Sequence, residues 1–243
     1  MPQNGQVPGL DTSNDRSSRT HKMTLLKKTL AATLALGLTF GVVAAPVGFA
    51  PVAQAAQPDA IELSPEQQEV VQRINAYFNS FKTLKGEFVQ TSPKGRVDRG
   101  VLFISKPGKL RFDYAPPSVL LIASDGKWLT IKDKKRERGD QFPLNATPLR
   151  YFVANKIDLM SDALITGFQQ ENGVATLALA DKKGSIRGQL LLVFDETRGE
   201  LTQWVSIDAR GQRLTVDVLN LEKDVALDPE LFQVTINRQQ RSK

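Results

Sequence analysis

Short segments of alternating apolar and polar residues, separated by glycine-containing turns, fill most of this 243-residue chain and restrict its possible folds. The clearest turns of the second half are Asn172-Gly173, Lys183-Gly184, Arg198-Gly199 and Arg210-Gly211. Alternation with a period of two is typical of strands that bury one face, and such short turns join neighbouring antiparallel strands. The pattern therefore predicts one antiparallel meander rather than parallel strands joined by helices.

The first half repeats the pattern. Two strands flank a turn near 93–95, and a hairpin turns at 124–126. Between them lies SKPGKLRFDYAPP, in which Leu110, Phe112 and Tyr114 point to one face of a strand. An antiparallel sheet of about ten or eleven strands results, and its twist makes a sheet of that size curl.

Two segments have the helical period instead. Residues 64–84 begin with the capping box SPEQ and are expected to end at Gly86, and residues 148–155 follow Thr147 as a cap. Their apolar residues are Val70, Ile74, Tyr77, Phe78, Phe81, Leu149, Tyr151, Phe152 and Val153. Since these faces must be buried, we expect an α+β, mainly β fold: an antiparallel half-open (unclosed) β-barrel with helices covering its concave apolar face.

The segment 1–55 is interpreted as a leader, followed by a single domain at 56–243. Met23 opens MTLLKKTLAATLALGLTFGVV, with two lysines before a long apolar run, and Ala53-Gln54-Ala55 supplies a cleavage pattern near Ala55. The alternative is a permanent membrane anchor, because the run is long enough to span a bilayer. Residues 1–22 are polar, and are either a mis-assigned start or a disordered extension.

Charge and cysteine content limit the possible partners. Five basic and two acidic residues lie in the leader, so half of the formal net charge of +6 is removed with it. The remaining basic residues are too dispersed for a nucleic-acid surface. The chain has no cysteine, and hence no disulfide, thiol nucleophile or acceptor for lipidation.

Catalytic residue patterns are not found beyond the leader. The one histidine, His21, lies upstream of the apolar run. Ser105 and Lys106 are adjacent on a strand, so their side chains point to opposite faces. The acidic candidates are Asp113, Asp125, Asp195 and Glu196, most of which lie in turns where such residues are common. We therefore predict no enzyme activity, no metal site and no cofactor.

Large apolar side chains are plentiful on the predicted strands. The set is Phe88, Phe103, Leu110, Phe112, Tyr114, Leu120, Ile122, Trp128 and Trp204. Packed interiors are the norm, so each of these can be ordinary core. If the sheet closes only partly, the same residues line a cavity, and composition does not distinguish the two.

Three stretches, FKTLKGEFVQ, ISKPGKLRFDYAPPSVLLIASDGKWLTI and TPLRYFVANK, resemble in order the LolA family of outer-membrane lipoprotein carriers. The resemblance runs from about Glu66 to Val234. It implies a soluble periplasmic chaperone, expected to be a monomer, with an apolar cavity for the acyl chains of lipoproteins. It also implies an inner-membrane ABC-type release complex as donor and an outer-membrane receptor as acceptor.

The resemblance also implies roles for particular residues. The acyl-chain cavity would comprise Phe88, Phe103, Leu110, Phe112, Tyr114, Leu120, Ile122 and Trp128, and the lid Phe78, Phe81, Tyr151 and Phe152. The family has a basic residue, usually arginine, that bonds to the lid backbone, and Lys106 stands at this position. Lysine lacks the planar fork of arginine, so Lys106 is either a weaker latch or a solvated residue before a turn. The C-terminus, QVTINRQQRSK, is shorter than that of relatives with an additional strand.

Two other functions stay open. A lipid- or lipoprotein-sensing regulatory protein can use the same half-barrel, although such proteins usually append a second domain. A hydrolase would require an acid–base pair, which the sequence does not supply.

Overall fold

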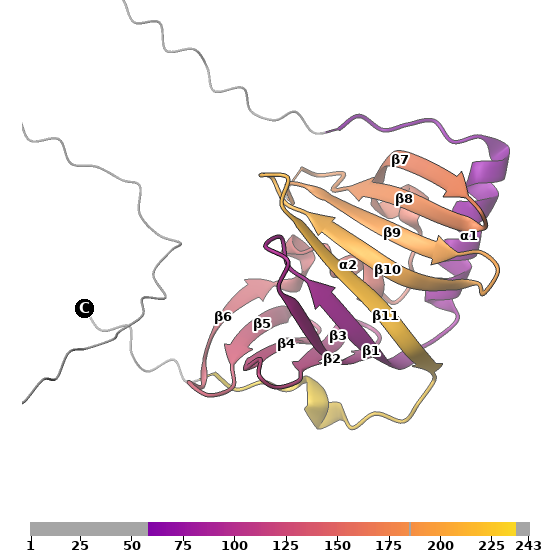
Figure 1. Cartoon of the computed structure of the whole chain (residues 1–243). Coiled ribbons are helices and arrows are strands. Elements are labelled where there is room, and N and C mark those ends of the chain that lie inside the picture. Colours follow the sequence, from indigo (N-terminus) through magenta and orange to yellow (C-terminus); the bar gives the residue numbers. More distant parts are fainter. Residues whose placement is uncertain (1–57, 185, 237–243) are drawn as a thin grey trace, which may run out of the picture. The chain divides into compact units, whose positions relative to one another are not determined.

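The computed structural model describes residues 58–184 and 186–236, and in them eleven strands form one antiparallel sheet. The order is β6-β5-β4-β3-β2-β1-β11-β10-β9-β8-β7, so that β6 and β7 are edge strands and the barrel is not closed (Figure 1). The strands are β1 (Thr83–Thr91), β2 (Val97–Ser105), β3 (Lys109–Tyr114), β4 (Leu120–Asp125), β5 (Trp128–Asp133), β6 (Arg138–Pro143), β7 (Leu164–Glu171), β8 (Val174–Ala180), β9 (Gln189–Asp195), β10 (Glu200–Ile207) and β11 (Arg213–Lys223). The predicted half-open antiparallel barrel is confirmed.

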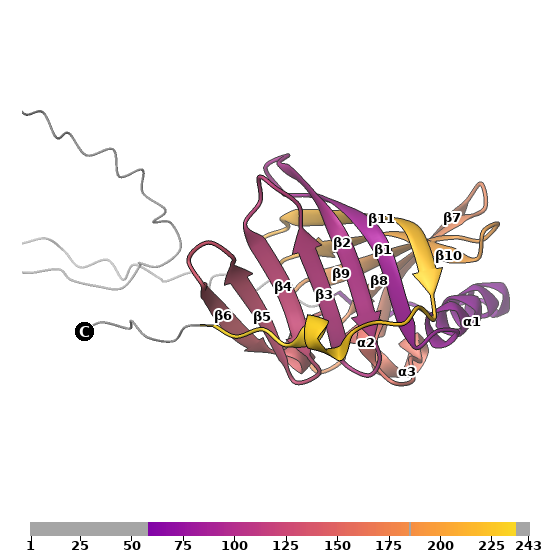
Figure 2. The same cartoon turned by 90° about the horizontal axis from the view of Figure 1, so that it is seen from below.

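The helical elements lie within the curve of the sheet (Figures 1 and 2). They are α1 (Pro65–Asn79), η1 (Leu144–Ala146), α2 (Arg150–Val153) and α3 (Leu159–Asp162), while η2 (Pro229–Phe232) follows the last strand. A single apolar cluster joins α1, α2 and α3 to the inward-facing residues of the strands. The core of the domain is therefore the layer between the helices and the concave face.

Helix α1 begins as predicted but ends earlier. The Ser64 hydroxyl accepts from the Gln67 amide at 3.3 Å, and the Gln67 side chain accepts from the Ser64 amide at 2.9 Å. The prediction that the helix continues to Gly86 was wrong, because β1 begins at Thr83 and pairs on both sides. Gly86 belongs to this strand, where a Cβ would overlap the Leu221 side chain.

The second helical segment also differs from its prediction. Helix α2 is one turn long, and Thr147 does not cap it; the Thr147 hydroxyl and amide both donate to Leu144 O of the preceding 3₁₀ turn. Helix α3, which the sequence did not predict, is capped by Asp158. Four residues are too few to establish a helical period, so tertiary contacts decide these elements.

The chain after β11 covers part of the convex face. Figure 2 shows it crossing the sheet, and Arg111 Nη1 on β3 donates to Leu231 O at 2.9 Å. Phe232 is buried, and so are Leu121 and Ala123 on the outer face of β4. The outer face of β3 and β4 therefore has a small apolar layer of its own.

The predicted leader and its cleavage position lie outside the described residues. Within 58–184 and 186–236, no helix has both the length and the apolar character required to cross a bilayer. All these residues belong to one compact unit.

Candidate functional site

An apolar space, which we call the hollow, lies between the helices and the concave face. It is lined by Tyr77, Phe78, Phe81, Leu84, Leu102, Ile104, Leu110, Phe112, Leu149, Phe152, Leu201, Trp204, Val218 and Leu221. The cavity has a volume of only about 20 Å³. Because this is space for roughly one water molecule, the structure represents a closed state. Any larger ligand must displace the helices.

The row of aromatic residues on β3 faces this hollow. Leu110 and Phe112 line it, and Tyr114 continues the same face one step further. The Phe88 ring lies 5.2 Å from that of Phe112 and 4.9 Å from that of Tyr114, in edge-to-face geometry. The Tyr114 hydroxyl donates to Gln90 Oε1 at 2.7 Å, which satisfies the polar atom of an otherwise apolar wall.

Two residues of β4 extend the wall. Ile122 is the cross-strand partner of Phe112, and both Leu120 and Ile122 are partly buried against the core cluster. They do not line the hollow itself, so the structure places them at its periphery.

Phe103 and Trp128 are not brought into the hollow. Phe103 pairs with Arg111 on the opposite face of the sheet, and its neighbours Leu102 and Ile104 point inward instead. In the uninterrupted apolar run VLFI, alternation cannot indicate which residues point inward. Trp128 is 39% exposed and lines a separate recess of about 430 Å³ at the end of the sheet.

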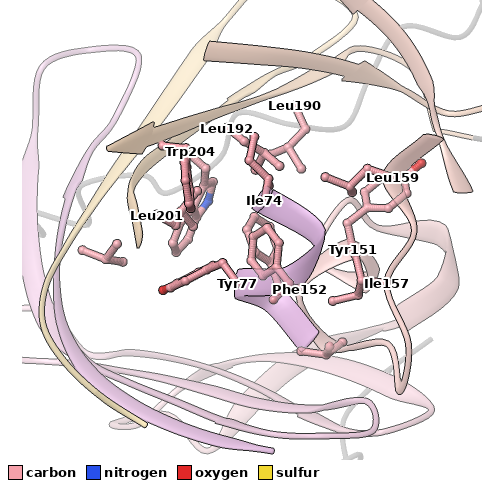
Figure 3. Packing of buried hydrophobic residues seen from close by; sticks show 14 of the residues in the cluster. Ile74, Tyr77, Tyr151, Phe152, Ile157, Leu159, Leu190, Leu192, Leu201 and Trp204 are labelled. Carbon is pink, nitrogen blue, oxygen red and sulfur yellow. The ribbon is translucent and has the colours of Figure 1, made fainter. Parts of the chain in front are cut away.

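Two of the predicted lid residues, Phe78 and Phe152, form an aromatic cluster with Trp204 of β10. The Phe78 and Phe152 rings lie 5.7 Å apart. The Phe152 and Trp204 rings lie 5.0 Å apart, and Figure 3 shows both side chains in the apolar interior. Phe81 lines the hollow but follows α1 rather than belonging to it. Tyr151 is buried and lies on the other side of α2, away from the hollow.

Lys106 contacts the lid. Its ammonium donates to Phe78 O and lies 4.1 Å from the centroid of the Phe81 ring. Phe78 O belongs to the last turn of α1, where carbonyls have no partner within the helix and attract a cation. Partial burial lowers the pKa of Lys106 to about 8.

The turn that contains Lys106 also contacts α2. The amide of Gly108 donates to Val153 O at 2.7 Å. Gly108 has a φ of +79°, and a Cβ there would overlap Gly126. Residues 106–108, which we call the clasp turn, therefore bond to the C-terminal ends of both α1 and α2.

An ion pair that the sequence analysis missed attaches α2 to the turn after β8. Arg150 Nη2 lies 2.6 Å from Asp181 Oδ1, and the side chain of Asp181 is 1% exposed. Arg150 also donates to the Tyr151 hydroxyl at 2.7 Å. Burial opposes the charge of Arg150, but the hydrogen bonds and charge interactions with Asp181 and Tyr151 together outweigh burial and raise the pKa of Arg150. The two residues are distant in the sequence, and no local pattern pairs them.

Helix α1 is attached by further polar contacts. The Asn79 side chain accepts from the Ile157 amide and donates to Ile157 O at 2.9 and 2.8 Å, and Asn75 accepts from the Leu159 amide at 3.0 Å. Lys223 Nζ lies 3.1 Å from the Ser80 hydroxyl. Helix α1 is thus bonded to the sheet and to the segment before α3.

The acidic candidates have structural partners. Asp113 lies 2.7 Å from Arg111 and 3.0 Å from Lys134; these cations outweigh partial burial and lower the pKa of Asp113. Asp125 and Asp195 accept from backbone amides of their own turns, and Glu196 pairs with Arg73. In the described part of the chain, no three metal-binding side chains converge. The chemistry offered by the site is burial of apolar groups.

Comparison with known proteins gives consistent matches. Residues 79–235 match the family model described as outer membrane lipoprotein carrier protein LolA. An outer-membrane lipoprotein carrier protein from Dechloromonas aromatica is 26% identical over 176 residues, or 68% of this chain and 83% of that one. One from Chromobacterium violaceum is 39% identical over 74 residues, 29% of this chain and 36% of that one.

Among solved structures, a LolA superfamily protein from Nitrosomonas europaea is similar to this chain. It has a TM-score of 0.42 and 9% sequence identity, and the alignment covers 68% of this chain and 96% of that one.

Proposed function

Because this chain belongs to the outer membrane lipoprotein carrier protein LolA family, we propose that it binds the acyl chains of lipoproteins in the hollow and carries them across the periplasm. Its cargo would come from an inner-membrane ABC-type release complex and pass to an outer-membrane acceptor or receptor. The leader 1–55 would direct export and be cleaved near Ala55. The domain 56–243 would act as a carrier without catalysis.

The observation that carries this proposal is the composition of the hollow. Every side chain that lines it is aliphatic or aromatic, and the aromatic rings come from both the helical lid and the sheet. Burial of a methylene group stabilises a complex by about 0.8 kcal/mol. A surface of this kind therefore favours hydrocarbon chains over any polar ligand.

The closed state explains how such a carrier also releases its cargo. A cavity of about 20 Å³ holds no acyl chain, so binding must replace contacts of the lid by contacts of the ligand. A ligand shifts an equilibrium only by the difference between its affinities for the open and closed states. Closure of the lid thus competes with the cargo and keeps the affinity below that of permanent burial.

The proposed cargo contacts differ from those expected from sequence. Leu110 and Phe112 remain the proposed centre of the site, with Phe88 and Tyr114 behind them and Leu120 and Ile122 at its periphery. Leu102 and Ile104 take the place of Phe103 on β2, and Trp128 is left out. The proposed lid residues are Phe78, Phe81 and Phe152, with Lys106 as the latch.

The test is transfer of a triacylated lipoprotein. The purified protein, residues 56–243, is added to spheroplasts that synthesise a labelled lipoprotein, and the soluble complex is then given outer-membrane vesicles. We expect the cargo to appear in a stoichiometric soluble complex and to move to the vesicles. If labelled cargo stays in the spheroplast membrane at every concentration of the protein, the proposed function is wrong.

A further inference from the structure

A row of four cross-strand neighbours lies at one end of the concave face. Cross-strand pairing joins Leu179 to Leu190, Leu190 to Ser206, and Ser206 to Leu214, so that β8, β9, β10 and β11 each contribute one residue. The row lines a recess of about 350 Å³. The preceding row of the same strands, which contains Leu192 and Trp204, is fully buried. In the row itself Leu179 and Leu190 are also buried, whereas Ser206 and Leu214 are partly exposed, so the wall becomes accessible at β10 and β11.

This recess has an apolar floor and a polar rim. Leu179, Leu190 and Tyr151 line it and also belong to the core cluster, so its floor is continuous with the apolar interior. Gln212 and Asp208, in the turn between β10 and β11, lie on its rim and are exposed. A ligand here would meet hydrocarbon on one side and water on the other.

The recess and the clasp turn lie at opposite ends of the domain. Pro93, just before β2, borders the recess, whereas Lys106 follows β2 directly. The nine residues of β2 span roughly 30 Å. The clasp end is sealed by the bonds from Lys106 to Phe78 O and from Gly108 to Val153 O. At the recess end, the pair of Asp181 and Arg150 attaches α2 to the turn after β8, and the recess lies beside this attachment.

A carrier of acylated proteins needs an opening of this kind. The acyl chains favour the apolar interior, but the polypeptide attached to them has backbone polar groups that must remain hydrogen-bonded. The junction between chain and polypeptide therefore belongs where an apolar wall meets a polar rim. A volume of about 350 Å³ equals that of roughly ten water molecules, which suits a glyceryl group and a residue or two but no folded domain.

We propose that this recess binds the acylated amino-terminal end of the cargo, an inference that rests on the proposed function. The hydrocarbon chains are directed toward the clasp turn, and the polypeptide leaves the recess beside Gln212. Leu179 and Leu190 contact the first carbons of the chains, and Leu214 contacts the glyceryl group. Ser206 and the rim contact the glyceryl and peptide groups. Tyr151 of α2 forms the opposite wall, so cargo in the recess lies directly against the lid.

The test is site-specific crosslinking to a synthetic triacylated lipopeptide. A photoreactive phenylalanine analogue replaces Gln212 in one protein and Trp128, in the separate recess at the other end, in another. Both positions are exposed and neither lines the hollow. We expect the adduct at position 212, on the first residues of the lipopeptide, and none at position 128. An adduct at 128 and not at 212 overturns the inference while leaving the proposed function intact.

A second measurement uses substitutions on one strand. Leu214→Trp fills the recess, while the matched control Leu219→Trp adds the same bulk at an exposed position of β11, 46% exposed. We expect Leu214→Trp to weaken lipopeptide binding about tenfold and to leave binding of a free fatty acid within twofold. Unchanged lipopeptide binding overturns the inference. If the unmodified protein binds neither probe, the proposed function fails instead.

Discussion

The ammonium of Lys106 and the backbone oxygen of Phe78 form a direct hydrogen bond between the sheet and the last turn of α1. The contact joins the clasp turn to the lid at the point where helix carbonyls lack partners. It is the geometry that the resemblance implied for an arginine at this position, and the role of Lys106 as a latch stays a prediction. Whether it controls the lid is a separate matter, which the first two predictions address.

Removal of this bond should loosen the lid. In Lys106→Met the side chain keeps an unbranched apolar stem but loses its donor, so α1 is held by fewer contacts. A Trp128→Phe background leaves Trp204, which lies under Phe152, as the only tryptophan. We expect the acrylamide quenching constant of Trp204 to be about two- to threefold larger in Lys106→Met. This change corresponds to a shift of roughly 0.5 kcal/mol in the free energy of opening the lid. Equal quenching in the two proteins would remove Lys106 from the latch.

The lowered pKa of Lys106 predicts a pH dependence of stability. The pKa is about 8 in the folded protein against an ordinary value of 10.5 for lysine, so between these pH values the unfolded chain binds more protons. Stability conferred through this residue therefore rises with pH in that window. Because Lys106 is partly exposed, solvent screening reduces the effect to about 1 kcal/mol.

The measurement is urea unfolding of the native protein and of Lys106→Met at pH 8 and pH 10. The difference between the two proteins isolates Lys106 from other groups, including Tyr77 and Tyr114, whose pKa values burial raises. We expect the free energy of unfolding of the native protein to increase relative to that of the variant as the pH rises. A difference that is constant with pH would contradict the lowered pKa.

Charge placed within the hollow should prevent acyl binding. Phe112 is 5% exposed and packs against Phe88 and Trp204, so Phe112→Glu brings a carboxylate into an apolar wall. We expect loss of fatty-acid binding by more than about tenfold, together with roughly 3 kcal/mol of lost stability. Binding is measured by displacement of a fluorescent fatty acid, at a temperature where circular dichroism shows the variant folded.

The matched control is Phe103→Glu, which makes the same change on the neighbouring strand but on the convex face. It should bind fatty acid as the native protein does. Equal losses in both variants would mean that the effect of Phe112→Glu arises from instability and not from the site.

These residues also show what the sequence determines. The turns at Asn172-Gly173 and Arg198-Gly199 and the alternation in KLRFDY predicted their strands and the inward row of β3. The run VLFI of β2 has no alternation, so its inward residues depend on pairing with β3. The early end of α1 has the same origin, because pairing of β1 on both sides outweighs the helical period.

The polar contacts that hold the lid cannot be predicted from local sequence patterns, for a different reason. The Lys106 contact followed from a family resemblance, but nothing near Arg150 or Asp181 in the sequence indicates that they meet. Their approach depends on the path of the chain between β6 and β7. Such long-range pairs become visible only once the fold is known.

The pair of Arg150 and Asp181 provides the last prediction. Asp181 is buried, so Arg150→Met leaves a carboxylate in an apolar surrounding without this cation. We expect a loss of about 3 kcal/mol in the free energy of unfolding, whereas the double variant Arg150→Met/Asp181→Asn should recover part of it because the buried charge is removed. The amide side chain introduced by Asp181→Asn can still accept from the Ile186 amide, which Asp181 Oδ2 binds at 3.0 Å.

Urea unfolding of the two single variants and the double variant gives the coupling energy, and quenching of Trp204 reports the lid. A coupling above about 1 kcal/mol, with increased quenching in Arg150→Met, is expected for an ion pair that holds α2. Purely additive losses would show that the two residues stabilise the domain independently. A lower free energy of unfolding without increased quenching of Trp204 would mean that the pair stabilises the domain without holding the lid. Helix α2 would then be held by the clasp turn.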